Sequence, residues 1–124
     1  MINVLIVDDS KIARNKLKDT LAELGNYFNV VCEAEDGKDG LEKFTQNKID
    51  LVLTDIEMPN MNGIDMAQAI REIDQNVEIL VVSSVDIENV KQIFKQQHIK
   101  TITKPIKLQQ FKSVLSHLLR KGED

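Results

Sequence analysis

The chain has 124 residues, of which 42% are hydrophobic and 29% charged, values that are typical of one folded domain and exclude wholesale disorder. Sixteen basic against twenty acidic residues leave a net charge of −4, which excludes a general attraction to nucleic acid or to anionic lipid. One cysteine allows no internal disulfide, and no apolar run reaches the ~18 residues of a membrane span, so we expect a cytoplasmic domain without direct nucleic-acid binding or membrane insertion.

Short β-branched runs alternate with helix-spaced segments along the whole chain. The five predicted strands are residues 2–7, 30–34, 50–54, 78–82 and a weaker run at 100–103. Three of these runs are almost continuously apolar, which is typical of strands buried on both faces. We therefore expect a parallel sheet with helices on both sides.

Apolar residues at helical spacing follow each predicted strand. The first stripe consists of Ile12, Ala13, Leu17, Leu21 and Leu24, with Gly25 at the place of a C-terminal cap. The later helices are indicated by Gly40, Leu41 and Phe44, by Ile64, Ala67 and Ile70, by Val90, Ile93 and Phe94, and by Phe111, Val114, Leu115, Leu118 and Leu119. The last helix is predicted to end near residues 121–122, and the second and fourth carry few apolar positions.

Polar residues stand where four of the predicted strands end. The first strand runs into Asp8 and Asp9, the third into Asp55, the fourth into Ser83 and the fifth into Lys104. In open parallel sheets, ligands bind beyond the carboxyl ends of the strands. If the sheet forms, one crevice gathers three carboxylates, a hydroxyl and an ammonium group.

Three carboxylates in one crevice favour a hard divalent cation. Like charges at close range raise one another's pKa, and a bound cation removes that repulsion. Magnesium prefers oxygen ligands, often one or two carboxylates. Asp9 and Asp55 are the expected direct ligands, with Asp8 binding directly or through water, and the absence of histidine and cysteine from the cluster disfavours zinc.

A carboxylate can also accept a phosphoryl group as an aspartyl phosphate. Asp55 stands alone opposite the acidic pair and is the expected acceptor. Charge on the phosphoryl oxygens must then be neutralised, for which Mg²⁺, the Lys104 ammonium group and the Ser83 hydroxyl are available.

Each residue also has an ordinary structural interpretation. Asp8, Asp9 or Ser10 could cap the first helix, and Asp55 and Ser83 could be turn residues. Lys104 could be a surface lysine before a helix-starting proline. Their joint occurrence at successive strand ends favours a site.

The chain resembles a response-regulator receiver domain of the CheY-like kind. The resemblance rests on residues 4–10, residues 53–59 with 61–63, Ser83 at the end of the fourth strand, and the Lys104-Pro105 pair. It covers essentially the whole chain, so we expect a receiver domain over residues 1–124. It implies a (βα)5 flavodoxin-like α/β fold with one doubly wound five-stranded parallel sheet in the order 2-1-3-4-5.

The resemblance also implies a function within a two-component, phosphorelay-type pathway. Asp55 would accept the phosphoryl group from a sensor histidine kinase or phosphotransfer protein, so the domain would be a phosphoacceptor rather than an enzyme acting on other substrates. Asp8, Asp9 and Asp55 match the Mg²⁺-binding acidic set, with the backbone carbonyl of Glu57 as a further ligand. The helix 4–strand 5–helix 5 surface would then change for binding to an unknown output protein.

The remaining residues of the motif also have implied roles. Ser83 matches the hydroxyl that turns toward the phosphoryl group, and Lys104 matches the family's lysine, followed by a cis peptide bond before Pro105.

Some positions depart from the family pattern. Ser84 stands where a smaller residue is common, and Thr101 replaces the usual aromatic residue of the fifth strand, which argues against an aromatic switch and for a rearrangement of the loop and of helix four. Glu57 and Val85 occupy the positions that tune phosphoryl lifetime, and this pair predicts slow self-dephosphorylation.

Four other classes are weaker alternatives. The chain could be a receiver domain taken from a longer regulator with a DNA-binding or enzymatic output domain, or a pseudo-receiver that signals without phosphate. An Asp-nucleophile phosphohydrolase would carry its nucleophile after the first strand, and a flavodoxin would need a loop there that cradles phosphate, whereas Asp8 and Asp9 would repel it.

Overall fold

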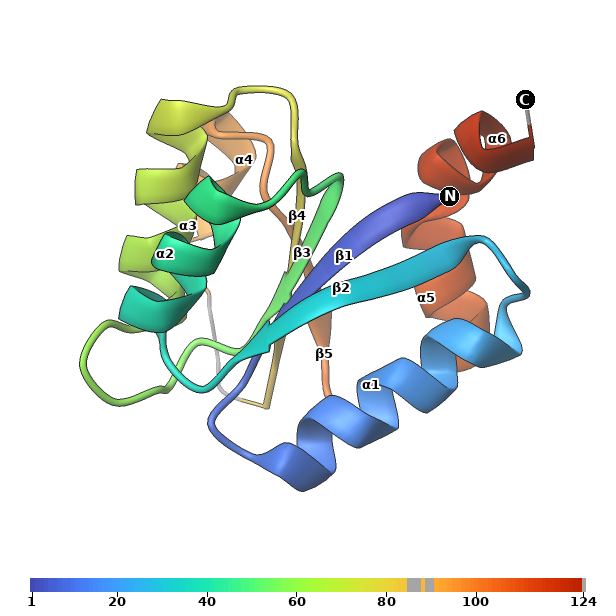
Figure 1. Ribbon diagram of the computed structural model, residues 1–124, viewed down its shortest axis with the longest axis horizontal. Coiled ribbons are helices and arrows are strands. Elements are labelled where there is room, and N and C mark those ends of the chain that lie inside the picture. The colour runs from blue at the N-terminus through green and yellow to red at the C-terminus, as the bar shows by residue number, and fades with distance from the viewer. Residues whose placement is uncertain (85–87, 89–90, 124) are drawn as a thin grey trace.

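A computed structural model describes residues 1–84, 88 and 91–123 of the chain. Strands and helices alternate from the N-terminus onward (Figure 1). The strands are β1 (Ile2–Val7), β2 (Phe28–Ala34), β3 (Leu51–Thr54), β4 (Glu78–Ser83) and β5 (Lys100–Thr103). The helices are α1 (Lys11–Glu23), α2 (Gly37–Gln46), α3 (Gly63–Ile73), α4 (Lys91–Gln96), α5 (Leu108–Val114) and α6 (Ser116–Glu123).

The five strands form one parallel sheet in the order β2-β1-β3-β4-β5. This confirms the predicted fold class and strand order. The three interior strands, β1, β3 and β4, are almost entirely buried, whereas β2 at one edge has partly buried and exposed positions and is fully buried only at Ala34. Continuous apolar runs therefore mark the strands that are covered on both faces.

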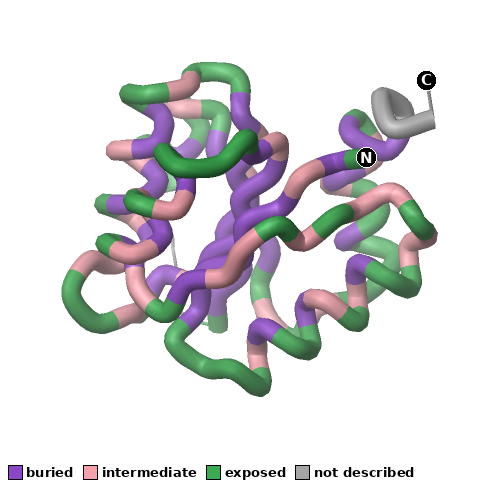
Figure 2. Tube along the Cα trace, in the orientation of Figure 1, coloured by how far each residue is buried: buried purple, intermediate pink, exposed green. Residues whose placement is uncertain are grey.

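Helices cover both faces of the sheet and divide the core into two layers. In Figure 1, α2, α3 and α4 lie on one side, and α1 and α5 on the other. Alternate residues of β1 supply the two layers: Leu5 and Val7 pack beneath the α2–α4 side, while Val4 and Ile6 pack beneath α1 and α5. Figure 2 shows the buried sheet between helices that are exposed on their outer faces.

The first helix begins as its sequence suggests and buries most of the predicted stripe, since Leu17 and Leu21 are both buried. Ser10 accepts a hydrogen bond from the Ala13 N–H at 3.2 Å and so is the N-cap, and Gly25 follows the helix with a φ of 125°. The predicted stripe was wrong at Ile12, which is 81% exposed, whereas Arg14 is buried beside the apolar residues of the helix. Two residues turn an α-helix by about 200°, so the two side chains point in nearly opposite directions.

The second helix, predicted with few apolar positions, is held by its neighbour α3. Gly37, Gly40 and Phe44 form its buried face. A Cβ atom at Gly40 would lie 2.6 Å from the Met66 sulfur of α3, so a larger residue there would have to displace the Met66 side chain. In α4, Phe94 is the buried residue, and Val90, predicted to belong to this helix, lies outside the described residues.

The predicted fifth helix is divided into two. α5 ends at Val114, and α6 begins at Ser116, because Leu115 adopts φ −94° and ψ 5° rather than regular helical angles. The apolar residues predicted for this helix still reach the core, since Phe111, Leu115, Leu118 and Leu119 are all buried. In the described part of the chain, no helix is both long and apolar enough to span a membrane.

Candidate functional site

The registers of the sheet bring the carboxyl ends of four strands to one edge. Thr54 at the end of β3 pairs with Val7 of β1 on one side and with Val81 of β4 on the other, and Ser83 pairs with Thr103 of β5. The residues that follow these strand ends therefore share one crevice, as predicted for a parallel sheet.

Three carboxylates meet at this edge. Asp8, Asp9 and Asp55 each offer a carboxylate oxygen, and these oxygens lie within 4.8 Å of one another. Asp8 is buried, Asp55 is half-buried and Asp9 is exposed, so the cluster opens toward solvent on one side. The predicted acidic set is therefore assembled by the fold.

Lys104 places an ammonium group beside two of these carboxylates. Its Nζ lies 3.8 Å from Asp8 Oδ2 and 3.7 Å from Asp55 Oδ2. The backbone N–H of Lys104 donates to the Ser83 carbonyl at 2.9 Å, and the Lys104–Pro105 peptide bond is cis, as predicted. One cation thus contacts two carboxylates that come from different strands.

The electrostatics of Asp8 reflect this crowding. Burial raises the pKa of its carboxyl group above the ordinary value, and the nearby charges of Asp55 and Asp9 act in the same direction. A hydrogen bond from the Ser10 N–H and the charge of Lys104 lower that pKa but do not cancel the effect. An added cation would favour the ionised form of Asp8.

The backbone around Asp55 is tightly held. Its N–H donates to the Val7 carbonyl at 3.0 Å, and its carboxylate Oδ1 accepts from the Ile56 N–H at 2.7 Å. A Cβ atom at Gly63 would lie 1.9 Å from the Asp55 carbonyl oxygen, so a larger residue there would displace the backbone of Asp55. Because Gly63 has no Cβ atom, the start of α3 can pack directly against the backbone of Asp55.

The other predicted residues lie nearby with less direct connections. Ser83 is buried at the end of β4 and is linked to Lys104 through its backbone carbonyl. Glu57 follows Asp55 by two residues and exposes its side chain, and Ser84 is exposed at the strand end. Val85, which was predicted to influence phosphoryl lifetime, lies outside the described residues.

Sequence reasoning missed Arg14, which lies beneath the acidic pair. Its Nη1 donates to the Asp8 carbonyl oxygen at 2.7 Å, and its Nε donates to Glu33 Oε1 at 3.1 Å. The available signal was its spacing from Leu17 and Leu21, which places it on the buried face of α1.

The donor set suits a hard divalent cation. Carboxylate oxygens from three residues, one of them buried, match the ligands that Mg²⁺ uses, and neither histidine nor cysteine belongs to this cluster of described residues. Beside it, Lys104 supplies a fixed positive charge for an anion. The arrangement can therefore hold a cation and a phosphoryl group next to each other.

The chain matches the response regulator receiver domain over residues 4–116. It belongs to this family. The strand order and the acidic crevice described above are those that the family resemblance implied. Receiver domains are in general phosphoacceptor signalling domains of two-component systems rather than classical enzymes.

Two curated relatives show how widely the receiver domain is shared. The transcriptional regulatory protein HptR of Staphylococcus aureus is 34% identical over 120 residues, which are 97% of this chain and 47% of HptR. The chemotaxis protein CheY of Thermotoga maritima is 44% identical over 82 residues, which are 66% of this chain and 67% of that protein. The chain thus spans about half the length of HptR.

Solved structures of other receiver domains have the same fold. CheY of Borrelia burgdorferi, crystallised as a CheX–CheY–BeF3–Mg²⁺ complex, superposes with a TM-score of 0.85 at 29% identity, over 95% of this chain and 89% of that one. The response regulatory domain of MrkE from Klebsiella pneumoniae superposes with a TM-score of 0.85 over 98% of both chains. Its sequence identity is 23%, so this likeness concerns the fold alone.

Proposed function

We propose that this receiver domain is a phosphorylation-dependent switch whose phosphoacceptor is Asp55. The observation that carries the proposal is the position of Lys104 Nζ, 3.7 Å from Asp55 and 3.8 Å from Asp8, beside a cluster of three carboxylates. A structural ion pair needs one carboxylate, whereas phosphoryl transfer needs an acceptor together with separate groups that neutralise charge.

In the proposed reaction, a carboxylate oxygen of Asp55 attacks the phosphorus atom of a phosphohistidine. The new P–O bond forms as the P–N bond breaks, and the electron pair of that bond stays with the imidazole nitrogen. Lys104 neutralises negative charge on one phosphoryl oxygen, and the hydroxyl group of Ser83 donates to another. Asp55 is half-buried and therefore accessible to the donor.

Asp8, Asp9, Asp55 and the backbone carbonyl of Glu57 would hold Mg²⁺ in this proposal. A bound Mg²⁺ would neutralise charge on the phosphoryl oxygens and on the carboxylates. The protein's own contribution is to place these oxygens in advance: Asp8 is anchored by the Ser10 N–H at 2.9 Å, and Asp55 by the Ile56 N–H at 2.7 Å.

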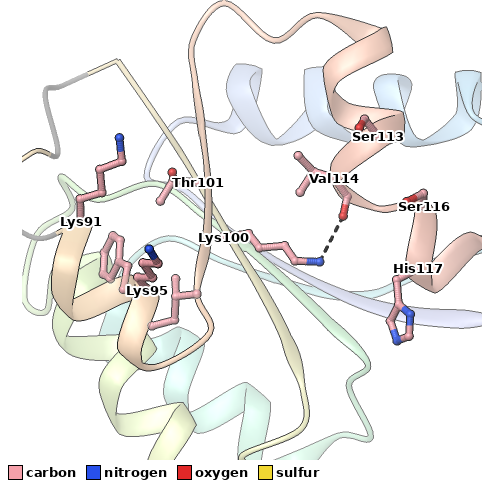
Figure 3. Close-up of a pocket in the computed structure, with 10 residues that line it drawn as sticks. Lys91, Lys95, Lys100, Thr101, Ser113, Val114, Ser116 and His117 are labelled. Carbon is pink, nitrogen blue, oxygen red and sulfur yellow. Dashed lines mark hydrogen bonds between the residues drawn. The ribbon is translucent and has the colours of Figure 1, made fainter.

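We propose that the α4–β5–α5 face carries the output. A groove of about 480 Å³ runs along this face, and Lys91, Lys95 and Lys100 are among its lining residues (Figure 3). Lys100 donates to the Val114 carbonyl at 3.3 Å, and the short side chain of Thr101 lines the groove. None of the described lining residues is acidic, so we expect the output partner to present acidic side chains.

We propose two classes of partner, one that donates the phosphoryl group and one that receives the signal. A sensor histidine kinase or a phosphotransfer protein donates the phosphoryl group, and a separate output protein binds the switched face. The receiver domain would extend over residues 1–124. The match to HptR, a transcriptional regulatory protein twice as long as the matched region, favours an alternative in which this domain controls the output domain of a longer regulator.

Two finer expectations follow from residues that differ from the family pattern. With Glu57 and Val85 at the positions that tune phosphoryl lifetime, slow self-dephosphorylation is predicted. Because Thr101 offers no aromatic ring, the signal would pass through the loop after β4 and through α4.

Phosphorylation by acetyl phosphate tests the acceptor. The wild-type protein, incubated with acetyl phosphate and Mg²⁺, should gain about 80 Da in intact mass, as expected for one acyl phosphate. Asp55→Asn should gain nothing, and the matched variant Asp65→Asn, changed at an exposed aspartate of α3, should label like the wild type.

Two results would contradict the proposal. Equal labelling of Asp55→Asn and the wild type would exclude Asp55 as the acceptor. Continuous release of phosphate from a phosphate ester would instead support a phosphohydrolase.

A further inference from the structure

A buried arginine ties the acidic loop to the sheet. The guanidinium group of Arg14 donates from Nη1 to the Asp8 carbonyl oxygen at 2.7 Å and from Nε to Glu33 Oε1 at 3.1 Å. Asp8 belongs to the loop between β1 and α1, whereas Glu33 belongs to β2, the neighbour of β1 in the sheet. Arg14 therefore connects three elements through two of its nitrogens.

Glu33 is held in place from both of its carboxylate oxygens. Lys18 Nζ lies 3.0 Å from Oε2, and Lys43 of α2 donates to the Glu33 backbone carbonyl. The hydrogen bond from Lys18, followed by that from Arg14, lowers the pKa of the Glu33 carboxyl group. Glu33 is therefore a fixed anion that both orients Arg14 and balances its positive charge.

This connection opposes a tendency of the acidic loop to open. Asp8 is buried next to two other carboxylates whose oxygens lie within 4.8 Å, an arrangement that repulsion alone would widen. The bond from Arg14 acts on the backbone of Asp8 and leaves its carboxylate free to bind a cation. Glu33 balances the positive charge of the Arg14 guanidinium group. This reduces the repulsion between the guanidinium group and a cation bound by the three carboxylates.

We propose that Arg14 is a positioning residue that pre-organises the Asp8–Asp9 pair for binding Mg²⁺. The inference rests on the proposed function, because it assumes that this cluster binds the cation. Lysine could not replace Arg14, since a single ammonium group lacks the planar fork that reaches the Asp8 carbonyl and the Glu33 carboxylate together.

The test compares two variants, each of which changes one of the two cationic residues that pair with Glu33. Arg14→Lys keeps a positive charge next to Glu33 but loses the double connection. Lys18→Met removes the other cation that binds Glu33 and leaves the bond between Arg14 and Asp8 intact. For each protein, the Mg²⁺ dissociation constant is measured by isothermal titration calorimetry, and the unfolding midpoint is measured in urea without Mg²⁺.

We expect Arg14→Lys to raise the Mg²⁺ dissociation constant by about tenfold or more, as is usual when a group that orients a metal ligand is lost. Lys18→Met should raise that constant by less, because the bond from Arg14 to the Asp8 carbonyl remains, although both variants lose some stability. An unchanged dissociation constant in Arg14→Lys, or an equal rise in both variants, would overturn the inference while the proposed function stands. Failure of the wild-type protein itself to bind Mg²⁺ would overturn both.

Discussion

At the scale of single residues, the site is defined by carboxylates that the fold holds together against their mutual repulsion. Asp8 shows this most clearly, because it is buried, lies beside two other acidic residues and has a raised pKa. Lys104 and the Ser10 N–H offset part of the cost. Burial of Asp8 beside two other carboxylates therefore costs stability unless a bound cation offsets the repulsion.

Replacing Asp8 with asparagine should therefore stabilise the Mg²⁺-free protein at neutral pH. Asparagine keeps the oxygen that accepts from the Ser10 N–H and removes one of the clustered charges. The sign follows from the raised pKa: the folded wild type binds a proton more tightly than the unfolded chain, so its stability falls as the pH rises above 3.8 through the folded pKa. The stability gained by Asp8→Asn should thus be complete at pH values above the folded pKa and absent at pH values well below 3.8.

Urea unfolding at several pH values, with and without Mg²⁺, checks this expectation. The exposed Asp19→Asn substitution in α1 is the matched control and should lack the pH-dependent gain. With Mg²⁺ the wild type should gain more stability than Asp8→Asn, because it binds the ion more tightly. An Asp8→Asn variant that is less stable than the wild type at neutral pH without Mg²⁺ would contradict the prediction.

At the scale of elements, two buried arginines add hydrogen bonds between segments that also meet in the apolar core. Arg14 connects α1, the acidic loop and β2. Arg71, at the end of α3, donates to the Val77 carbonyl at 2.6 Å and to the Gln97 carbonyl at 2.9 Å, and it also reaches His98. It thereby fixes the entry into β4 and the turn between α4 and β5.

Replacing Arg71 with methionine should lower the free energy of unfolding by about 2–3 kcal/mol, because buried carbonyl oxygens lose a charged donor. Glu72→Met, an exposed change in the same helix, is the matched control and should have little effect. Urea denaturation measures both variants. If Arg71→Met loses no more stability than Glu72→Met, the hydrogen bonds of Arg71 make no net contribution to the free energy of unfolding.

At the scale of the whole molecule, the acidic crevice and the α4–β5–α5 groove are joined by β5 itself. Lys104 follows the last residue of this strand and contacts the carboxylates, while Thr101 and Lys100, within the same strand, line the groove. A second groove, lined by Asn47 and Asn76 among others, involves the ends of α2 and α3 and none of the crevice residues. β5 and the residue that follows it thus supply residues to both the crevice and the α4–β5–α5 groove, whereas the described lining of the second groove includes no residue of β5.

Phosphorylation should accordingly change amide chemical shifts at Lys100 and Thr101 more than at Asn47 and Asn76. The reason is that charge added at Asp55 would rearrange α4 and the loop after β4, and Lys100 and Thr101 line the same groove as α4. Two-dimensional ¹H–¹⁵N NMR spectra, recorded with Mg²⁺ before and after addition of acetyl phosphate, measure the effect.

The Asp55→Asn protein under identical conditions controls for the reagents and should show no change at either groove. Shift changes confined to the residues around Asp55 in the wild type would contradict coupling to the α4–β5–α5 face.

The sequence by itself determined the alternation of elements, the burial of the central strands and the residue types at the strand ends, because these depend on local patterns of apolar and polar residues. Asp8, Asp55 and Lys104 could be predicted to lie close together because the ends of parallel strands meet at one edge.

Only the tertiary structure decided that Ile12 lies outside the buried face of α1, where the last helix divides at Leu115, and which partners Arg14 and Arg71 bind. A long charged side chain takes its partner from whichever backbone oxygens and carboxylates the neighbouring elements bring within reach. That neighbourhood exists only once the chain has folded.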